Sequence, residues 1–327
     1  MATPSYTQNL NELYATTLRL VADETTNNIF EAVPLLKKLQ AMGRVKSQVG
    51  GSVIEERLVY AKNTSAQSIG RGGTVDLVKE ENFTNARYDW KYITGHIVRY
   101  YVDVQQNRGK AKIMDLVEGG VKALKDSMID AVEEMLINGT ATDSQNTLGL
   151  KQIVADTNTN TIGGLSSSDI SEWANYSKNM TGLSAATNLL KQMNVAYNNI
   201  SKYMGANQFP DLVICSQDVY EYLEDEVQDM TTVDLTTAKG EADLAYSSIT
   251  YKKMPIVWSP KMDSQRLYML NTSFLRLVID PEDWMKLREW RPIENTPDDM
   301  VAHVIFPMEF VTSARNRHAV LHTIDTE

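Results

Sequence analysis

The longest regular pattern of apolar positions along the chain lies between Lys110 and Asn138. Apolar side chains recur there every three or four residues, which predicts one face of an α-helix, and no proline interrupts the run. Such a helix would extend about 40 Å. The Gly119-Gly120 pair is a weak point inside it, and Gly139 is expected to end it in a left-handed conformation. The pattern alone fits a long core helix as well as a strut against which sheets lie.

A period of two replaces the helical period after Gly50. Ser52–Tyr60 and Arg87–Val104 alternate between apolar and polar positions, which predicts two long strands, the second with Tyr88 and Trp90 on one shared face. About twenty polar, glycine-containing residues separate the two runs, which is unusual for a loop inside a compact domain. We therefore expect a hairpin whose tip projects and contacts a neighbouring chain.

The flanking segments predict an arm and an α/β subdomain. Residues up to Gly43 read as short amphipathic helices, one of which Pro34 ends or bends. Downstream of the long helix, a short strand is expected at Leu150–Val154. Strands and helices then alternate around a small sheet, with helices at Ser184–Met204 and Gln217–Met230 and strands at Pro210–Cys215, Met254–Trp258, Leu267–Leu270 and Phe274–Ile279. Two last strands, Val301–Thr312 and His318–Ile324, flank a turn at Ala314–Arg317.

Composition is that of a soluble globular protein, with 43% hydrophobic and 23% charged residues. The 327 residues exceed the size at which one core stops growing, so two subdomains are expected. The net charge of -10 argues against a surface that grips nucleic acid, although it allows a wall that encloses it. The sequence lacks a membrane-spanning run and the regions of a signal peptide, so we expect no membrane association and synthesis in a cytoplasm.

A search for catalytic and ligand-binding patterns assembles no site. His318 and His322 have the spacing of a zinc pair on a helix, but on a strand they would lie about 13 Å apart. The glycine-rich run Gly70–Thr74 lacks the Lys-Ser/Thr of a phosphate-binding loop. Cys215 reads as a buried apolar residue, and the carboxylates of Gln217–Met230 predict a solvated helix face. We expect no catalytic residue, no cofactor and no metal ion, which favours an architectural role.

Six phrases of the sequence, taken in order, carry a family resemblance. They are VPLLKKLQAMGRVKSQVGGSVIEERLVY (33–60), TNARYDWKYITGHIV (84–98), NGT to LGLKQIV (138–154), FPDLVICSQDVYEYLE (209–224), LNTSFLRLVID (270–280) and SARNRHAVL (313–321). Together with the order of arm, hairpin, long helix and α/β subdomain, they resemble the major capsid proteins of tailed double-stranded DNA bacteriophages. Those proteins have the Hong Kong 97-type fold.

The resemblance implies an α+β chain in five parts: an N-terminal arm (1–49), an extended β-hairpin loop (50–108), the spine helix of a peripheral domain (109–148), an α/β axial domain (149–289) and return strands of the peripheral domain (290–327). The apolar stripe of the spine helix would pack on the peripheral strands. Its charged positions would face solvent or the shell interior, namely Lys112, Asp115, Glu118, Lys122 and Glu133.

The resemblance also implies self-assembly into hexamers and pentamers of an icosahedral shell around packaged double-stranded DNA, without sequence-specific binding. The chain would be made in the host cytoplasm and end in the virion capsid. Its partners would be further copies of itself, a separate scaffolding protein and a portal protein, with a cement protein as a further candidate. Some relatives carry a Lys–Asn crosslink; we assign none here, although Lys62 and Lys79 lie in the loop region.

Contacts between subunits are expected at seven residues in four parts of the chain: Leu35 and Leu36 in the arm, Arg71 at the hairpin tip, Tyr88 and Trp90 on the hairpin, and Arg315 and Arg317 at the last turn. Packing within the chain suits Tyr88 and Trp90 equally well. Two other functions stay open. One is a cellular nanocompartment shell of the same fold that encloses enzymes, and the other is an acidic α/β hydrolase with a cleft within 149–289.

Overall fold

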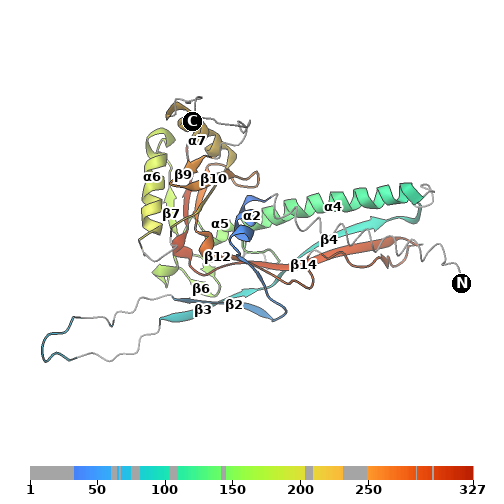
Figure 1. Cartoon of the computed structure of the whole chain (residues 1–327), viewed down its shortest axis with the longest axis horizontal. Coiled ribbons are helices and arrows are strands. Elements are labelled where there is room, and N and C mark those ends of the chain that lie inside the picture. Colours follow the sequence, from blue (N-terminus) through green and yellow to red (C-terminus); the bar gives the residue numbers. More distant parts are fainter. Residues whose placement is uncertain are drawn as a thin grey trace, which may run out of the picture.

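The computed structural model describes residues 33–59, 65, 68–74, 82–102, 110–140, 145–202, 209–230, 249–284, 286–296 and 298–326. An upright body is built around a six-stranded sheet, and a long layer extends away from it beside one helix (Figure 1). A two-stranded hairpin projects from the junction of these two parts. Among the described helices, none is long and apolar enough to cross a membrane.

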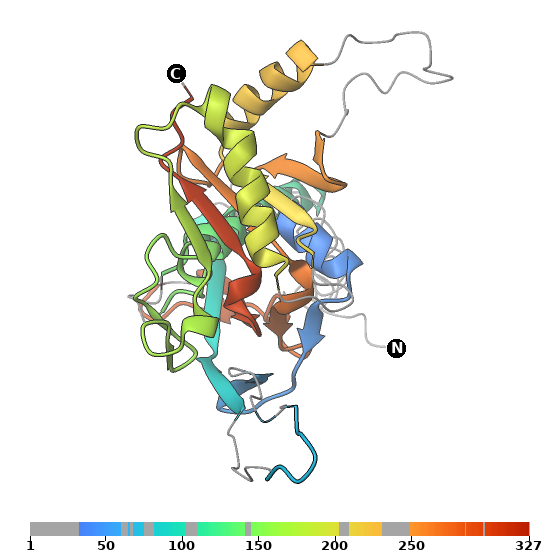
Figure 2. The ribbon, with the colours of Figure 1, turned by 90° about the vertical axis from the view of Figure 1, so that its left-hand side faces the viewer.

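The six-stranded sheet has the strand order β7-β15-β11-β8-β10-β9. Helix α6 lies across one face of it (Figure 2), where Leu189 and Met193 of α6 and Leu223 of α7 share a core with Val213 and Cys215. The predicted helices and strands of this part are confirmed with small shifts at their ends. Their bounds are Ala185–Ile200 (α6), Gln217–Met230 (α7), Ala319–His322 (β15), Arg266–Leu270 (β11), Leu212–Cys215 (β8) and Met254–Trp258 (β10). The two edge strands, Tyr176–Asn179 (β7) and Thr250–Tyr251 (β9), are not among the predicted elements.

The second sheet has the order β1-β12-β14-β13, with β4 also paired to β14. Strand β14 (Met300–Thr312) is its axis, because it pairs antiparallel with β4 over its first part and with β12 over its last part. We call this sheet the peripheral sheet. Its other strands are Val45–Ser47 (β1), Leu275–Ile279 (β12), Arg291–Pro292 (β13) and Lys91–Arg99 (β4).

Helix α4 spans Lys110–Asn138, as the apolar period predicts, and runs along the peripheral sheet (Figure 1). It lies close to β4: a Cβ placed on Gly95 would come within 2.7 Å of Leu124. Its last turns enter the core between the two sheets, where Val132 and Leu136 are fully buried. The predicted packing of its apolar stripe on the peripheral strands is thereby confirmed for the side chains that the structure describes.

For one residue of α4, the prediction that its charged side chain is exposed is wrong. Glu133 is only 8% exposed and accepts a hydrogen bond of 2.5 Å from the Ser259 hydroxyl. Glu133 faces the segment that carries Ser259 and is covered by it, whereas its neighbour Glu134 is exposed. Lys122 is exposed as expected, whereas Lys112, Asp115 and Glu118 lie in the part of α4 whose side chains are not described.

Pro34 begins α2 (Pro34–Ala41), one of the short helices expected up to Gly43, because a proline fits the first helical position, where its missing N–H is not needed. The arm helices expected before residue 33 lie outside the described residues. The expected strand at Leu150–Val154 is wrong: Leu150–Ile153 forms the helical turn α5. A short apolar run is ambiguous between strand and helix, and burial of Leu150 and Ile153 suits either.

The predicted long strand Arg87–Val104 is two strands that belong to different sheets. Strand β3 (Phe83–Asp89) pairs with β2 (Val53–Val59) in the hairpin, whereas β4 pairs with β14. The alternation changes phase at Trp90: Tyr88 and Ile93 are buried, but Tyr92 is 65% exposed. The predicted single face from Tyr88 onward is therefore wrong, because each half turns its apolar side toward its own sheet.

The chain also changes sheets at other places than the expected boundary at residue 289. Strand β12 belongs to the peripheral sheet although it lies within 149–289, and β15 belongs to the six-stranded sheet although it lies within 290–327. The crossings coincide with two short 3-10 turns, Thr272–Phe274 (η2) and Arg315–Arg317 (η3). A smaller unit below the junction consists of β5 (Thr161–Ile162), β6 (Leu165–Ser166) and η1 (Ser171–Trp173).

The end of α4 is closed by a backbone contact and not by a left-handed glycine. Gly139 has no positive φ. Its carbonyl accepts a hydrogen bond of 3.0 Å from the Gly149 N–H, and a Cβ added at Gly139 would lie 2.1 Å from the Thr147 carbonyl oxygen. The glycine is needed because two backbone segments meet at this point.

We predict that Gly139→Ala lowers the free energy of unfolding by about 3 kcal/mol, because the new methyl group collides with backbone atoms that cannot rotate away. Gly119→Ala is the matched control. Gly119 is exposed within α4 with no atom within 4 Å of an added Cβ, so alanine should raise stability by about 1 kcal/mol. Urea denaturation of the unassembled variants measures both, and equal effects would contradict the close contact at Gly139.

Candidate functional site

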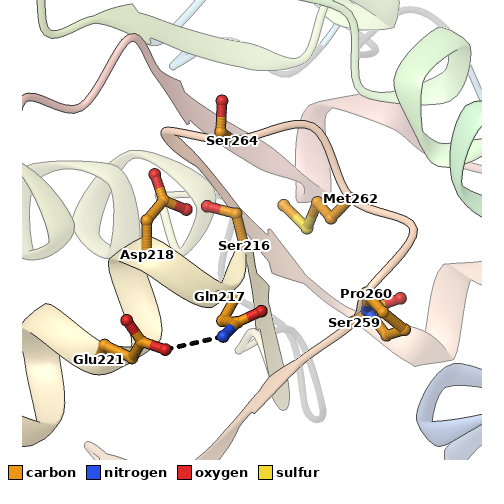
Figure 3. A pocket seen from close by; sticks show the side chains of 8 residues that line it. All are labelled: Ser216, Gln217, Asp218, Glu221, Ser259, Pro260, Met262 and Ser264. Atoms are coloured by element: carbon orange, nitrogen blue, oxygen red, sulfur yellow. Dashed lines mark hydrogen bonds between the residues drawn. The ribbon is translucent and has the colours of Figure 1, made fainter.

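A cleft of about 360 Å³ opens at the end of the six-stranded sheet where β8 and β10 finish (Figure 3). Serine hydroxyls and two carboxylates line it, and several are already engaged. Asp218 accepts a hydrogen bond of 2.7 Å from the Gln265 N–H, and Glu221 accepts one of 2.8 Å from the Gln217 amide (Figure 3). Among its described lining residues there is no histidine to act as a base for Ser216. The hydrogen bonds of the two carboxylates fix the segments around the cleft, and its lining residues do not pair a nucleophile with a base.

The hairpin is fixed to the peripheral sheet by a cluster of three charges. Glu56 of β2 is 8% exposed and forms ion pairs with Arg276 of β12 and Lys46 of β1, the latter at 3.6 Å. Apolar contacts surround this cluster, since Ile54 of the hairpin shares a small core with Val311 of β14. Loss of one partner of a buried pair is costly, so the base of the hairpin is held firmly on the sheet.

Tyr88 belongs to this anchor. It is 3% exposed, and its hydroxyl donates a hydrogen bond of 2.9 Å to the Thr312 carbonyl. Burial raises the pKa of Tyr88 well above its ordinary value. Trp90 is half-buried and packs beside the same core. The sequence left open whether these two residues contact another subunit or pack within their own chain. Tyr88 packs within its own chain, and Trp90 is only partly accessible to another one.

The outward face of the hairpin carries an apolar pair that the sequence analysis missed. Val59 and Phe83 stand directly opposite each other in the ladder, and they are 65% and 70% exposed. Two pairs further along this face, beyond Arg57 and Asn85, Glu55 and Arg87 form an ion pair at 3.1 Å. The register of the hairpin explains their exposure. Because Val53 pairs with Asp89, Val59 and Phe83 both fall on the side of the hairpin that faces solvent. The hairpin thus has a packed inner face and an uncovered outer one.

The far end of the hairpin is described only at residues 65 and 68–74. A turn closes there through a hydrogen bond of 3.0 Å from the Gly73 N–H to the Gly70 carbonyl, with Gly72 at φ +85°. Arg71 in this turn is exposed, so its predicted contact with another chain stays a prediction. Lys62 and Lys79 lie outside the described residues.

Arg315 was expected at a subunit contact, and the structure corrects this. Its side chain is fully buried, and its guanidinium donates to the Ile153 carbonyl at 2.8 Å and to the side-chain oxygens of Asn160 at 2.8 Å and Asn175 at 3.2 Å. Burial lowers the pKa of Arg315 to about 10. Arg315 thus connects three segments of its own chain at the point where the chain passes from one sheet to the other. Its side chain is not accessible to a neighbouring subunit there.

His318 lies beside Arg315 and is also fully buried. Burial, together with the charges of Arg315 and Arg317, lowers the pKa of His318 to about 3. The imidazole is therefore neutral in the fold, and its Nδ1 accepts a hydrogen bond of 3.3 Å from the Asn271 N–H. Arg317 is half-buried; its guanidinium lies over the Phe274 ring at 5.6 Å.

Leu35 and Leu36 of α2 are the remaining candidates, and they are 2% and 0% exposed in the core between the sheets. Apolar helix residues at such positions fill the chain's own interior, so they offer no surface to another subunit. Of the seven residues predicted from sequence, only Arg71 is exposed, and Trp90 and Arg317 are partly so.

A second cleft, of about 160 Å³, lies between the base of the hairpin and β5, with Glu309 of β14 in its wall. Glu309 is 1% exposed and accepts a hydrogen bond of 3.1 Å from the Leu148 N–H. Burial raises the pKa of Glu309 to about 8. No sequence pattern marks this residue, because it stands in the apolar run of β14 without any companion motif.

Comparison with protein-family models and with curated proteins gives no match. Solved structures do match. A chain of the cyanophage A-1(L) capsid asymmetric unit is 18% identical with a TM-score of 0.64, over 87% of this chain and 91% of that one. The capsid of an empty GTA particle gives 10% identity and a TM-score of 0.58, over 87% and 89%.

The chain has the phage capsid-protein fold. The holo-SrpI encapsulin complex from Synechococcus elongatus also matches, with 12% identity and a TM-score of 0.53 over 90% of this chain and 89% of that one. At sequence identities this low, the three matches show a shared fold and nothing more. The family resemblance seen in the sequence is therefore confirmed at the level of a mixed α+β capsid fold.

Replacing Arg315 by lysine should lower the free energy of unfolding by about 3 kcal/mol, because an ammonium cannot reach the three acceptors of the planar guanidinium at once. Arg317→Lys is the control and should cost less than about 1 kcal/mol. Thermal and chemical denaturation of both variants test this. Equal losses would show that Arg315 does not join the loops as its hydrogen bonds indicate.

Glu309 predicts a dependence of stability on pH. Its pKa rises from an ordinary 4.5 to about 8 in the fold, so between these values the folded chain holds a proton that the unfolded chain has released. Its contribution is therefore fully present below about pH 4.5 and is lost as the pH rises through about 8. Glu309→Gln should remove this loss, so the variant gains stability over the natural chain at pH 8.5 relative to pH 5. An unchanged difference at the two pH values would contradict a buried, protonated Glu309.

Proposed function

We propose that this chain is a major capsid protein that assembles into hexamers and pentamers of an icosahedral shell around packaged double-stranded DNA. The observation that carries the proposal is the fold match over 87% of the chain with a cyanophage capsid subunit, at a TM-score of 0.64. The net charge of -10 is consistent with a wall that encloses DNA and does not grip it.

The hairpin is the proposed contact between neighbouring subunits. Its base is held by Glu56 and Tyr88, so it presents a fixed outer face. Val59 and Phe83 on that face expose apolar surface that a neighbour could cover. Contacts of this head-to-tail kind close into rings when each copy uses one patch to cover a different patch of the next. We propose Arg71, Val59 and Phe83 as the first contact residues, with Trp90 and Arg317 as partial contributors.

The remaining parts of the proposal follow the resemblance. The partners are further copies of the chain, a scaffolding protein and a portal protein, with a cement protein as a candidate, and the place of action is the virion capsid after assembly in the host cytoplasm. We propose no enzymatic activity. The larger described cleft supports this, because its serines stand beside carboxylates whose hydrogen bonds hold loops.

A shell that encloses proteins is the second candidate, and the match to an encapsulin complex at a TM-score of 0.53 supports it. The higher TM-scores of the two phage-type capsids favour the first. Shells purified from the natural source distinguish them. Long double-stranded DNA inside supports the capsid proposal, and a protein cargo without nucleic acid supports the alternative.

We expect the full chain, expressed alone or with its scaffolding partner, to give closed shells in electron micrographs. Phe83→Glu should reduce the yield of shells at least tenfold without changing the unfolding midpoint, because it places a charge where a neighbour covers an exposed ring. Phe83→Tyr is the matched control and should assemble normally, since it keeps the ring.

The outcomes separate the two levels of the proposal. A monodisperse monomer under every assembly condition would contradict a shell protein of either kind. Normal shells from Phe83→Glu would contradict only the assignment of the hairpin's outer face as a contact.

A further inference from the structure

Two of the four histidines of the chain lie side by side on neighbouring strands of the peripheral sheet. His96 of β4 stands directly opposite His303 of β14, and their ring centroids are 6.3 Å apart with planes inclined by 51°. Gly95, the neighbour of His96, faces α4, so the histidine pair lies on the opposite face of the sheet. His96 is exposed and His303 is half-buried.

The register of the sheet brings the two imidazoles as close as strands allow. The His303 carbonyl accepts a hydrogen bond of 2.8 Å from the Arg288 N–H, so the peptide groups of His303 point away from β4. His96 and His303 therefore form a non-hydrogen-bonded pair, in which the Cα atoms are about 4.5 Å apart and the side chains are closest. Both histidines are held by long, paired strands, so their positions are determined by backbone that is already ordered.

We propose that His96 and His303 together bind one divalent ion of a first-row transition metal. An ion about 2.0–2.1 Å from each nitrogen would hold the ring centroids about 5 Å apart at a tetrahedral angle and about 6.3 Å apart in a linear arrangement. The observed 6.3 Å lies at the end of this range, so a rotation of the rings that closes the gap by about 1 Å completes a tetrahedral site.

The surroundings determine which ion fits. The cross-strand pairs on either side are Thr94 with Ile305 and Val98 with Val301, none of which carries a charge. On the other side of His303 stands Arg288, whose guanidinium forms an ion pair with Asp283 at 3.5 Å. Among the described residues, no group of three or more His, Cys, Asp or Glu side chains surrounds such a site, so water completes the coordination. Two neutral imidazoles without a carboxylate select metals that prefer nitrogen, in the order Cu²⁺ above Ni²⁺ and Zn²⁺, and disfavour Mg²⁺ and Ca²⁺.

Calorimetric titration of the full chain with Ni²⁺ tests the site. We expect about one ion per chain, at least tenfold weaker binding for His96→Gln and for His303→Gln, and a further loss in the double variant, in which neither imidazole ligand remains. His322→Gln is the matched control: His322 lies on β15 of the other sheet, so this variant should bind as the natural chain does.

Electron paramagnetic resonance with Cu²⁺ gives an independent readout. Two equivalent nitrogen ligands are expected in the natural chain and one in either single variant. Equal Ni²⁺ affinity in the natural chain and both single variants, or a Cu²⁺ spectrum without two nitrogens, would overturn the proposal. Neither measurement depends on whether the chain forms shells, so a failure here leaves the proposed function untouched.

Discussion

The last turns of α4 are the constraint on which the rest of the structure depends. Val132 and Leu136 are fully buried in a core that also contains Phe306 of the peripheral sheet and Tyr268 of the six-stranded sheet. Each such side chain contributes about 1.5–3 kcal/mol when it is buried. Both sheets pack on the same helix end, so they share one core. This shared core fixes how the two sheets are oriented relative to each other. The backbone contact at Gly139 follows from the same crowding.

Buried titratable side chains, two of them charged and one protonated below about pH 8, mark the places where one part of the chain meets another. Glu56 joins the hairpin to the peripheral sheet, Arg315 joins the crossing to three acceptors of its own chain, and Glu309 accepts a hydrogen bond from the segment that follows α4. Buried charges contribute little net stability, since their desolvation offsets much of their attraction. Their partners, however, are in reach in one arrangement only. We infer that these groups specify the geometry of the junction, while the apolar core supplies most of its stability.

The sequence predicts the parts of this fold whose pattern is long or local. The bounds of α4 follow from its period, and the strand at Leu212–Cys215 follows from a run that is apolar throughout. Prediction fails where the answer depends on a partner far along the chain. Alternation cannot report that the strand around Trp90 changes sheets, since both halves alternate. Nor can it report that Arg315 is buried, because an isolated arginine normally indicates an exposed position and its acceptors are more than a hundred residues away.

The two faces of the hairpin differ in whether the chain itself covers them. Its inner face is completed within the chain, by Ile54 and Tyr88 against the peripheral sheet. Its outer face leaves Phe83 70% exposed, and in the proposed shell a neighbouring chain would cover it. A contact of this size contributes only about 1.5–3 kcal/mol, too little to hold two chains together against the cost of association. In the closed ring that we propose, however, every copy would give one such contact and receive one, so the contacts of the assembled state would add up cooperatively.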